Sequence, residues 1–266
     1  MRKLLAVASS IPVISLIGFS LTGCDNNPFD TADTIAGAIV AGHEAAVAFD
    51  TLPANVVNFI RDNYRIYYGH TSHGSQIMTG LSMLATESTE YALPDFHEVS
   101  GDLGSNGDVT WASSTRAFLD AHPGDYNVVM WSWCGGVSDN TAAGIQTYLD
   151  TMTQLETDYP DVVFIYMTGH LDGTGTGGNL YARNNQIRDF TTANRRALFD
   201  FADVESYDPA GHYYPNATDN CGWCSDWCAT HSCPACSSCA HSHCLNCYLK
   251  GKAFWSMMAQ IAGRES

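Results

Sequence analysis

The chain has 266 residues, 45% of them hydrophobic, and carries 28 acidic against 12 basic side chains, for a formal net charge of −16. This length and hydrophobic content are enough to build the core of one large domain. A charge this negative argues against a nucleic-acid partner, which needs a basic footprint, and against docking on anionic lipid through a basic patch.

The first 23 residues have the pattern of an export signal. Arg2 and Lys3 precede an apolar run, Leu4 to Leu21, which with these flanks is a poor membrane-spanning helix. The run ends Leu21-Thr22-Gly23-Cys24, which is similar to the cleavage box of bacterial lipoproteins. The similarity implies acylation of Cys24 and a protein held in the bacterial cell envelope, facing the periplasm or the exterior. An ordinary signal peptide or anchor with an incidental Cys is the alternative.

Strand-like and helical segments alternate along the rest of the chain. Runs typical of strands cover residues 64–68, 97–99, 127–133, 162–167 and 197–202, and helical periodicity covers residues 76–84, 112–121, 142–159, 180–196 and 249–262. This alternation predicts an α/β domain with a parallel sheet, and the apolar middle strands predict helices on both faces. We expect a tether and lead-in over residues 24–50 and one domain over 51–266.

Candidate site residues follow the expected strands, because ligands of such sheets bind beyond the carboxyl ends of the strands. Ser72 and Ser75 stand after the first strand and just before a helix, where helix-terminal N–H groups favour a nucleophile, although a Ser there also caps helices. His170 and Asp172 lie in a Gly-rich loop without a phosphate-binding motif, which we interpret as facing a substrate. For His170, a plain loop hydrogen bond is the alternative.

Acidic side chains and histidines occupy the later loops. Asp203 and Asp208 follow the last strand and could orient an imidazole, or be solvated loop acids or calcium ligands. His241 and His243 precede the final helix, a suitable place for a general base.

Eight of the ten cysteines crowd into residues 221–247. The spacings include four CxxC pairs, which suit zinc or iron–sulfur ligation, but none is followed by the His that covalent haem needs. An exported protein meets oxidants, so disulfides are favoured, with a structural metal or a redox-active dithiol as alternatives. Cys134 stands alone at a strand end, either as a buried thiol or as a partner of this insert.

The segments GHTSHGSQI, WSWCGG, VFIYMTGHLDG and HSHCLNCYLKGKAFW resemble the SGNH/GDSL-type hydrolases over roughly residues 60–263. The resemblance implies a flavodoxin-like three-layer α/β/α fold with Ser72 as nucleophile and His241 as base. It also implies Gly104 as an oxyanion-hole residue, and Gly135 lies in the third-strand loop that would supply another. That loop lacks the family's Asn, and no Asp stands three residues before His241, so the acid is expected from another loop, with Asp203 as the candidate.

The resemblance implies a tethered serine esterase or deacetylase whose substrate is a small or carbohydrate-borne acyl ester. The alternative is an inactive relative that binds a glycan or a metal in the same cleft. No cofactor is expected, apart from the structural metal considered for the cysteines at 221–247.

Overall fold

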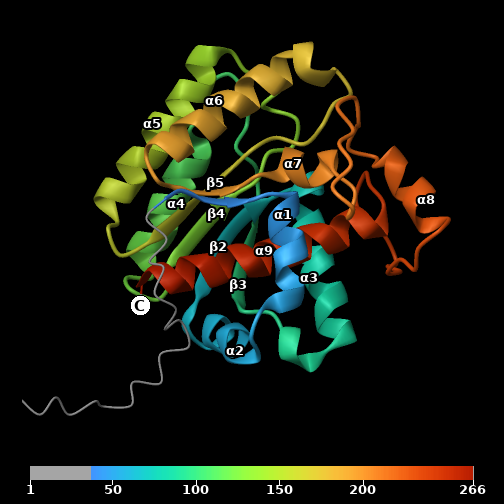
Figure 1. The fold of residues 1–266 in the computed structure, drawn as a ribbon. Coiled ribbons are helices and arrows are strands. Elements are labelled where there is room, and N and C mark those ends of the chain that lie inside the picture. The colour runs from blue at the N-terminus through green and yellow to red at the C-terminus, as the bar shows by residue number, and fades with distance from the viewer. Residues whose placement is uncertain (1–36, 266) are drawn as a thin grey trace, which may run out of the picture.

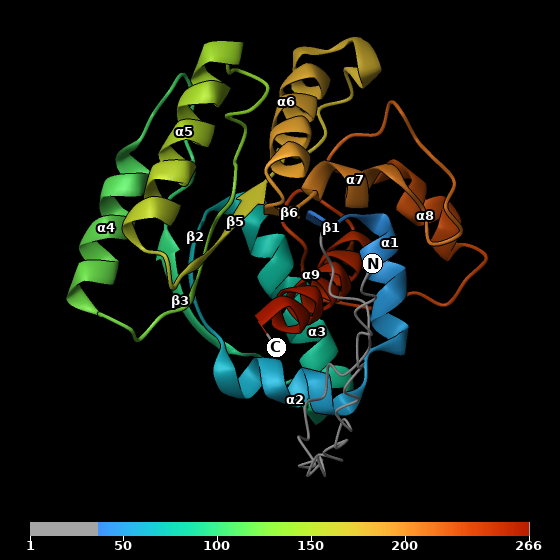
Figure 2. The ribbon, with the colours of Figure 1, turned by 60° about the vertical axis from the view of Figure 1, so that its left-hand side comes forward.

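The computed structural model describes residues 37–265 and shows a six-stranded parallel sheet between two layers of helices (Figure 1; Figure 2). The strands are β1 (Ile39–Ala41), β2 (Arg65–His70), β3 (Asp95–Ser100), β4 (Val128–Trp131), β5 (Val163–Met167) and β6 (Ala197–Phe199), in the order β1-β6-β5-β4-β2-β3. The predicted α/β class is therefore confirmed.

Five of these strands follow the flavodoxin-like order. Numbered along the chain from β2, the part of the sheet from β3 to β6 reads 2-1-3-4-5, and β1 adds a sixth strand beside β6. The lead-in expected over residues 24–50 thus contains, from Ile39 on, a strand and a helix of the folded domain. The order reverses between β2 and β4, and ligands of such sheets bind at this switch point.

Helices cover both faces of the sheet. The helices are α1 (His43–Ala48), α2 (Ala54–Asn63), α3 (Ser75–Glu87), α4 (Thr110–Ala121), α5 (Ala142–Asp158), α6 (Asn179–Ala193), α7 (Phe201–Ser206), α8 (Gly222–Cys228) and α9 (Cys244–Glu265). Helices α1, α2, α3 and α9 pack together on one face, and α4, α5 and α6 lie on the other (Figure 2). Among the helices of the described residues, none is long and apolar enough to cross a bilayer.

The sheet and α9 share one apolar core. Tyr68 lies beside Met130, and Met130 beside Ile165, in three adjacent strands, and all three side chains are fully buried. Phe254 and Met258 of α9 are equally buried against this face. Burial on both faces explains why the middle strands lack the alternating polar residues of a half-exposed sheet.

Four disulfides cross-link the cysteine-rich insert. Disulfide pairing is what we favoured for an exported protein. The pairs are Cys221–Cys224, Cys228–Cys233, Cys236–Cys244 and Cys239–Cys247. All eight thiols are consumed, so the insert retains no thiolate for the structural metal considered as an alternative. The export signal expected at residues 1–23 and the lipidation expected at Cys24 lie outside the described residues.

Candidate active site

Ser72 occupies a tight turn between β2 and α3. Its φ of 27° lies in the left-handed region, which a residue with a side chain adopts at a cost and which often marks functional sites. The turn also requires glycine at position 74, because a Cβ there would lie 2.1 Å from Ser132 Oγ, just after β4. The nucleophile candidate is thus held against the switch point by close backbone packing.

His241 reaches Ser72 from the opposite end of the chain. Its Nε2 forms a hydrogen bond with Ser72 Oγ, across 169 positions in sequence. The disulfides Cys236–Cys244 and Cys239–Cys247 bracket His241, whose φ of 59° is also positive. A cross-linked loop therefore fixes the imidazole where an unrestrained loop would have to be ordered at an entropic cost.

Ser75 and His243, the neighbouring candidates for the nucleophile and the base, have other roles. Ser75 Oγ donates to Ser72 O at 2.6 Å, which stabilises the turn. His243 Nδ1 accepts from Leu245 N at 3.1 Å and so caps the first turn of α9. The structure therefore brings together Ser72 and His241 rather than their neighbours.

Asp203, the acid expected from its position after the last strand, is bonded to His43 instead of His241. Asp203 Oδ2 accepts from His43 N at 2.8 Å and lies 2.6 Å from His43 Nδ1, so this carboxylate serves α1 instead of His241. Asp208 is also engaged elsewhere, accepting from Ala210 N and Tyr214 Oη at 3.0 Å each.

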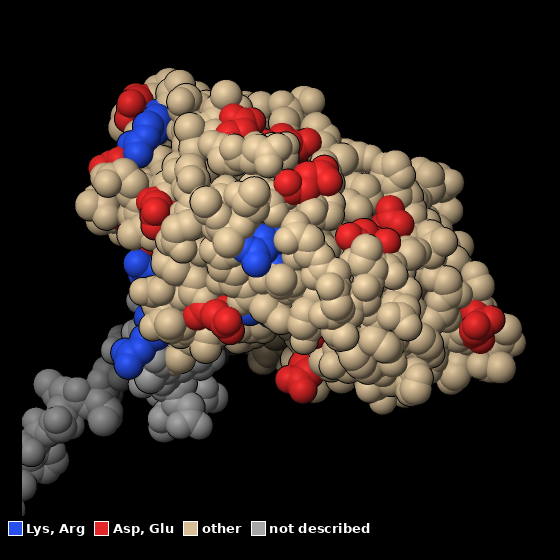
Figure 3. All heavy atoms as spheres, turned by 90° about the horizontal axis from the view of Figure 1, so that it is seen from above, with Lys and Arg blue, Asp and Glu red and all other residues tan. Residues whose placement is uncertain are grey.

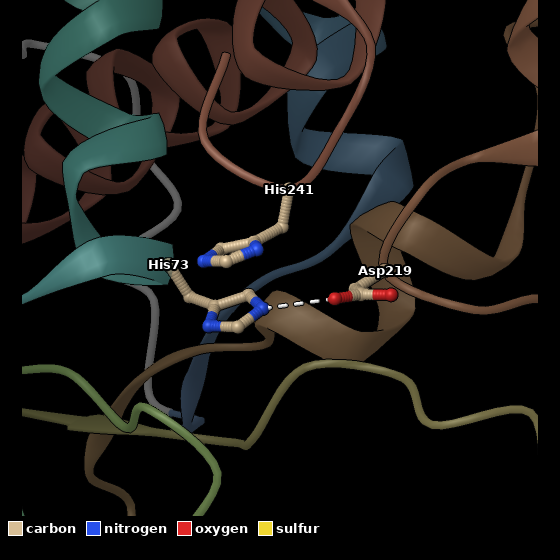
Figure 4. A group of neighbouring side chains, drawn as sticks. All are labelled: His73, Asp219 and His241. Atoms are coloured by element: carbon tan, nitrogen blue, oxygen red, sulfur yellow. Dashed lines mark hydrogen bonds and ion pairs between the residues drawn. The ribbon is translucent and has the colours of Figure 1, made fainter.

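Asp219 is the carboxylate at the site, and sequence reasoning missed it. Polar atoms of Asp219, His73 and His241 all lie within 4.8 Å of one another (Figure 4). Asp219 Oδ2 is 3.0 Å from His73 Nε2, and Asp219 N donates to Leu171 O at 3.1 Å. Asp219 stands two residues before the first cysteine of the insert, away from the positions where the family pattern and the last strand direct the search.

Three imidazole rings are stacked beside Ser72. His73 lies between His170, at a centroid distance of 3.6 Å and an angle of 3°, and His241, at 4.4 Å and 17°. Burial lowers the pKa of His73 to about 4, although its hydrogen bond to Asp219 opposes this. His73 is therefore neutral at pH 7, so the stack carries no charge on its middle ring to repel a proton arriving on His241.

Cys134 completes the surroundings of His73. Its thiol lies 3.6 Å from His73 Nδ1, and it is the free cysteine among the described residues. Cys134 was expected either as a buried thiol or as a disulfide partner of the insert. The structure shows an unpaired, partly buried thiol. His73 is thereby held from both sides, by Asp219 at Nε2 and by Cys134 at Nδ1.

The cluster of His73, Asp219 and His241 is a poor fit to a metal ion. Zinc binds imidazole nitrogens at about 2.0–2.1 Å, so the lone pairs of its ligands must converge on one point. The rings of His73 and His241 are stacked with only 17° between their planes, and in-plane lone pairs of stacked rings point side by side. The hydrogen bond to Asp219 also occupies Nε2 of His73.

The four predicted binding residues divide between the site and its walls. His170 belongs to the imidazole stack. Gly104 N donates to Asp102 Oδ1 at 2.9 Å, so the oxyanion role expected of this N–H is not supported. Gly135 has a φ of 83° in the loop after β4, next to Cys134. Asp172 forms a turn with Thr174 and a bridge to Thr218.

A buried ion pair lies beneath the site. Lys250 and Glu205 are both fully buried and 2.7 Å apart, and Lys250 Nζ also donates to Gln76 Oε1. Gln76 Nε2 in turn donates to Ala240 O at 2.5 Å, next to His241, and Glu205 Oε2 accepts from Leu171 N at 2.7 Å, next to His170. One buried network therefore anchors both loops that carry the stacked histidines.

Acidification from pH 7 to 4 should destabilise the fold through His73. The unfolded chain takes up a proton near pH 6.5 and the folded chain only near 4, so stability is lost as the pH falls between these values. The contribution is up to about 3 kcal/mol, at about 1.4 kcal/mol per pH unit. Urea unfolding at both pH values should show a smaller loss in His73→Gln than in wild type. The exposed His231→Gln is the control, and equal losses in all three proteins would contradict the assignment.

Searches of the chain against protein-family models and against curated proteins found no match. The site must therefore be interpreted from its own geometry.

Proposed function

We propose that the protein is an exported, lipid-anchored serine hydrolase that cleaves acyl esters, as its resemblance to SGNH-type hydrolases implied. The observation that carries the proposal is the hydrogen bond between Ser72 Oγ and His241 Nε2 at the switch point of the sheet. A nucleophile within reach of a base, with an acid nearby, is the arrangement by which serine hydrolases are recognised across unrelated folds.

In the proposed reaction, Ser72 Oγ attacks the ester carbonyl while His241 takes the hydroxyl proton. The proton then passes from His241 to the departing alcohol. Water, deprotonated by His241, attacks the acyl group on Ser72, and His241 returns the proton to Ser72 Oγ as the acid leaves. The negative charge of Asp219 stabilises the imidazolium formed in each step. Backbone N–H groups of Ser72 and of the loop at residues 134–136 are the candidate oxyanion donors, each typically worth about 10²–10³ in rate.

Labelling with a fluorophosphonate probe tests the nucleophile without knowledge of the substrate. The Ser72 oxygen would bond to phosphorus and displace fluoride, its proton passing to His241. We expect one label per chain, on the peptide that contains Ser72. The Ser72→Ala variant should take no label, and the matched Ser75→Ala variant should react like wild type.

Two results would refute the proposal. Absence of labelling in the wild-type chain with its four disulfides intact would favour the inactive binding protein. Equal labelling of wild type and Ser72→Ala would place the nucleophile elsewhere.

A further inference from the structure

A hollow lies next to the two segments that carry His170 and Asp219. It has a volume of about 170 Å³ and is lined by Tyr181, Tyr207 and Tyr213, among others. Leu171 and Ala217 also line it, and they adjoin His170 and the segment that leads to Asp219. Asp172 pairs with Thr218 in a bridge between these segments. The hollow is therefore built partly from the same two segments that carry His170 and Asp219.

Tyrosine rings are exposed at this hollow and nowhere else to the same degree among the described residues. Tyr181 is 39% and Tyr213 40% exposed, and the other strongly exposed large hydrophobic side chains of the described residues are all valines. Tyr213 also packs against Tyr207, at a centroid distance of 4.9 Å. An aromatic ring left in water around a concave site offers a flat apolar face to a ligand.

The charged side chains of the hollow are two carboxylates and one guanidinium. Asp172 and Asp203 line it, while its one cation, Arg188, is already bound to Asp200 through Nε at 2.6 Å and Nη2 at 2.8 Å. Acidic side chains are also more prominent than basic ones on the surface seen in Figure 3. An anionic ligand would find no free cation here, whereas the hydroxyl groups of a neutral ligand can donate hydrogen bonds to the carboxylate oxygens.

We propose that this hollow is a subsite for one ring of a neutral carbohydrate, whose apolar faces contact both Tyr181 and Tyr213 and whose hydroxyls donate to Asp172 and Asp203. The volume fits a single ring, since pockets for drug-sized ligands hold about 300–1,000 Å³. The inference deepens the proposed function, on which it rests for the identity of the substrate: the acyl ester cleaved at Ser72 is carried by a neutral glycan.

Calorimetric titration with xylotriose, which carries no acyl group, tests the subsite independently of catalysis. We expect saturable binding in the millimolar range and at least tenfold weaker binding in Tyr181→Ala and Tyr213→Ala. Tyr181→Phe keeps the ring and should bind within about twofold of wild type. Val109→Ala, at a comparably exposed residue outside the hollow, controls for loss of surface apolar area.

Each contrary result overturns the subsite. These results are absence of binding, equal binding by wild type and the Tyr→Ala variants, binding of trigalacturonate as tightly as xylotriose, or displacement of xylotriose by choline, which would indicate a cation site. The Ser72→Ala variant should bind xylotriose like wild type. Sugar binding without fluorophosphonate labelling would refute the hydrolase and leave the subsite standing, and labelling without sugar binding would do the reverse.

If both proposals hold, the kinetics connect them. On acetylated xylo-oligosaccharides, Tyr181→Ala should raise KM about tenfold with little change in kcat, because the ring binds a part of the substrate remote from the reacting carbonyl.

Discussion

Replacing Asp219 by Asn should lower kcat for ester hydrolysis about 10²-fold and leave KM within about twofold of the wild-type value. The Asp219 carboxylate lies within 4.8 Å of a ring nitrogen of His241, and two opposite charges at about this separation near a protein surface attract by about 3 kcal/mol. An amide loses this attraction for the imidazolium that forms in the transition state, and 1.36 kcal/mol corresponds to a factor of ten in rate.

The matched control is Asp203→Asn. Asp203 is the acid that sequence position favoured, but it binds His43, so on a short acyl ester that carries no sugar its amide variant should keep kcat within about twofold. Steady-state kinetics on a short acyl ester, with the free energy of unfolding of each variant measured in urea, separates the two effects. A larger loss of kcat in Asp203→Asn than in Asp219→Asn would mean that Asp203, not Asp219, stabilises the imidazolium of His241.

The contrast between Ser72 and Asp219 shows what a sequence can predict at such a site. Ser72 and His241 could be found because each stands at the end of a secondary-structure element, and the carboxyl edge of a parallel sheet gathers such ends. Asp219 stands within the long irregular stretch between α7 and α9, whose path depends on its disulfides and on contacts such as that of Asp219 N with Leu171 O. No local pattern encodes a contact of this kind.

The fold was predictable for the same local reasons, except for the first strand and the start of the last helix. The strands β2, β4 and β5 can be recognised in the sequence as continuous apolar runs, because both of their faces are buried. The strand β1 was missed because it has only three residues, Ile39–Ala41, and one of them faces outward. The first turn of α9, from Cys244, lies within the cysteine-rich insert. The cysteines there are spaced for disulfides, so the sequence shows no helical periodicity before residue 249.

Replacing Lys250 by Met should destabilise the protein by about 3–5 kcal/mol, a large share of the 5–15 kcal/mol by which domains are usually stable. The variant leaves Glu205 fully buried without its partner, which is where most of the loss arises. Burial lowers the pKa of Lys250, and the ion pair with Glu205 opposes that shift by favouring the charged form of Lys250. Urea unfolding at pH 7 measures the loss.

Lys252→Met is the matched control, on the same helix and two residues away. Lys252 pairs with Asp50, which is 65% exposed, so its loss should cost less than about 1 kcal/mol. Removing both buried charges in Lys250→Met/Glu205→Gln should recover much of the stability lost in the single variant, because no uncompensated charge remains. Equal losses in Lys250→Met and Lys252→Met would contradict a special role for the buried pair.

The double variant also separates stability from positioning. It restores electrical neutrality but lacks the donor that holds Gln76 Oε1, and Gln76 Nε2 is bonded to the carbonyl oxygen of Ala240, next to His241. We therefore expect slower fluorophosphonate labelling of Ser72 in a protein close to normal stability. Labelling at the wild-type rate would mean that the disulfides on either side of His241 place the imidazole without help from the buried network.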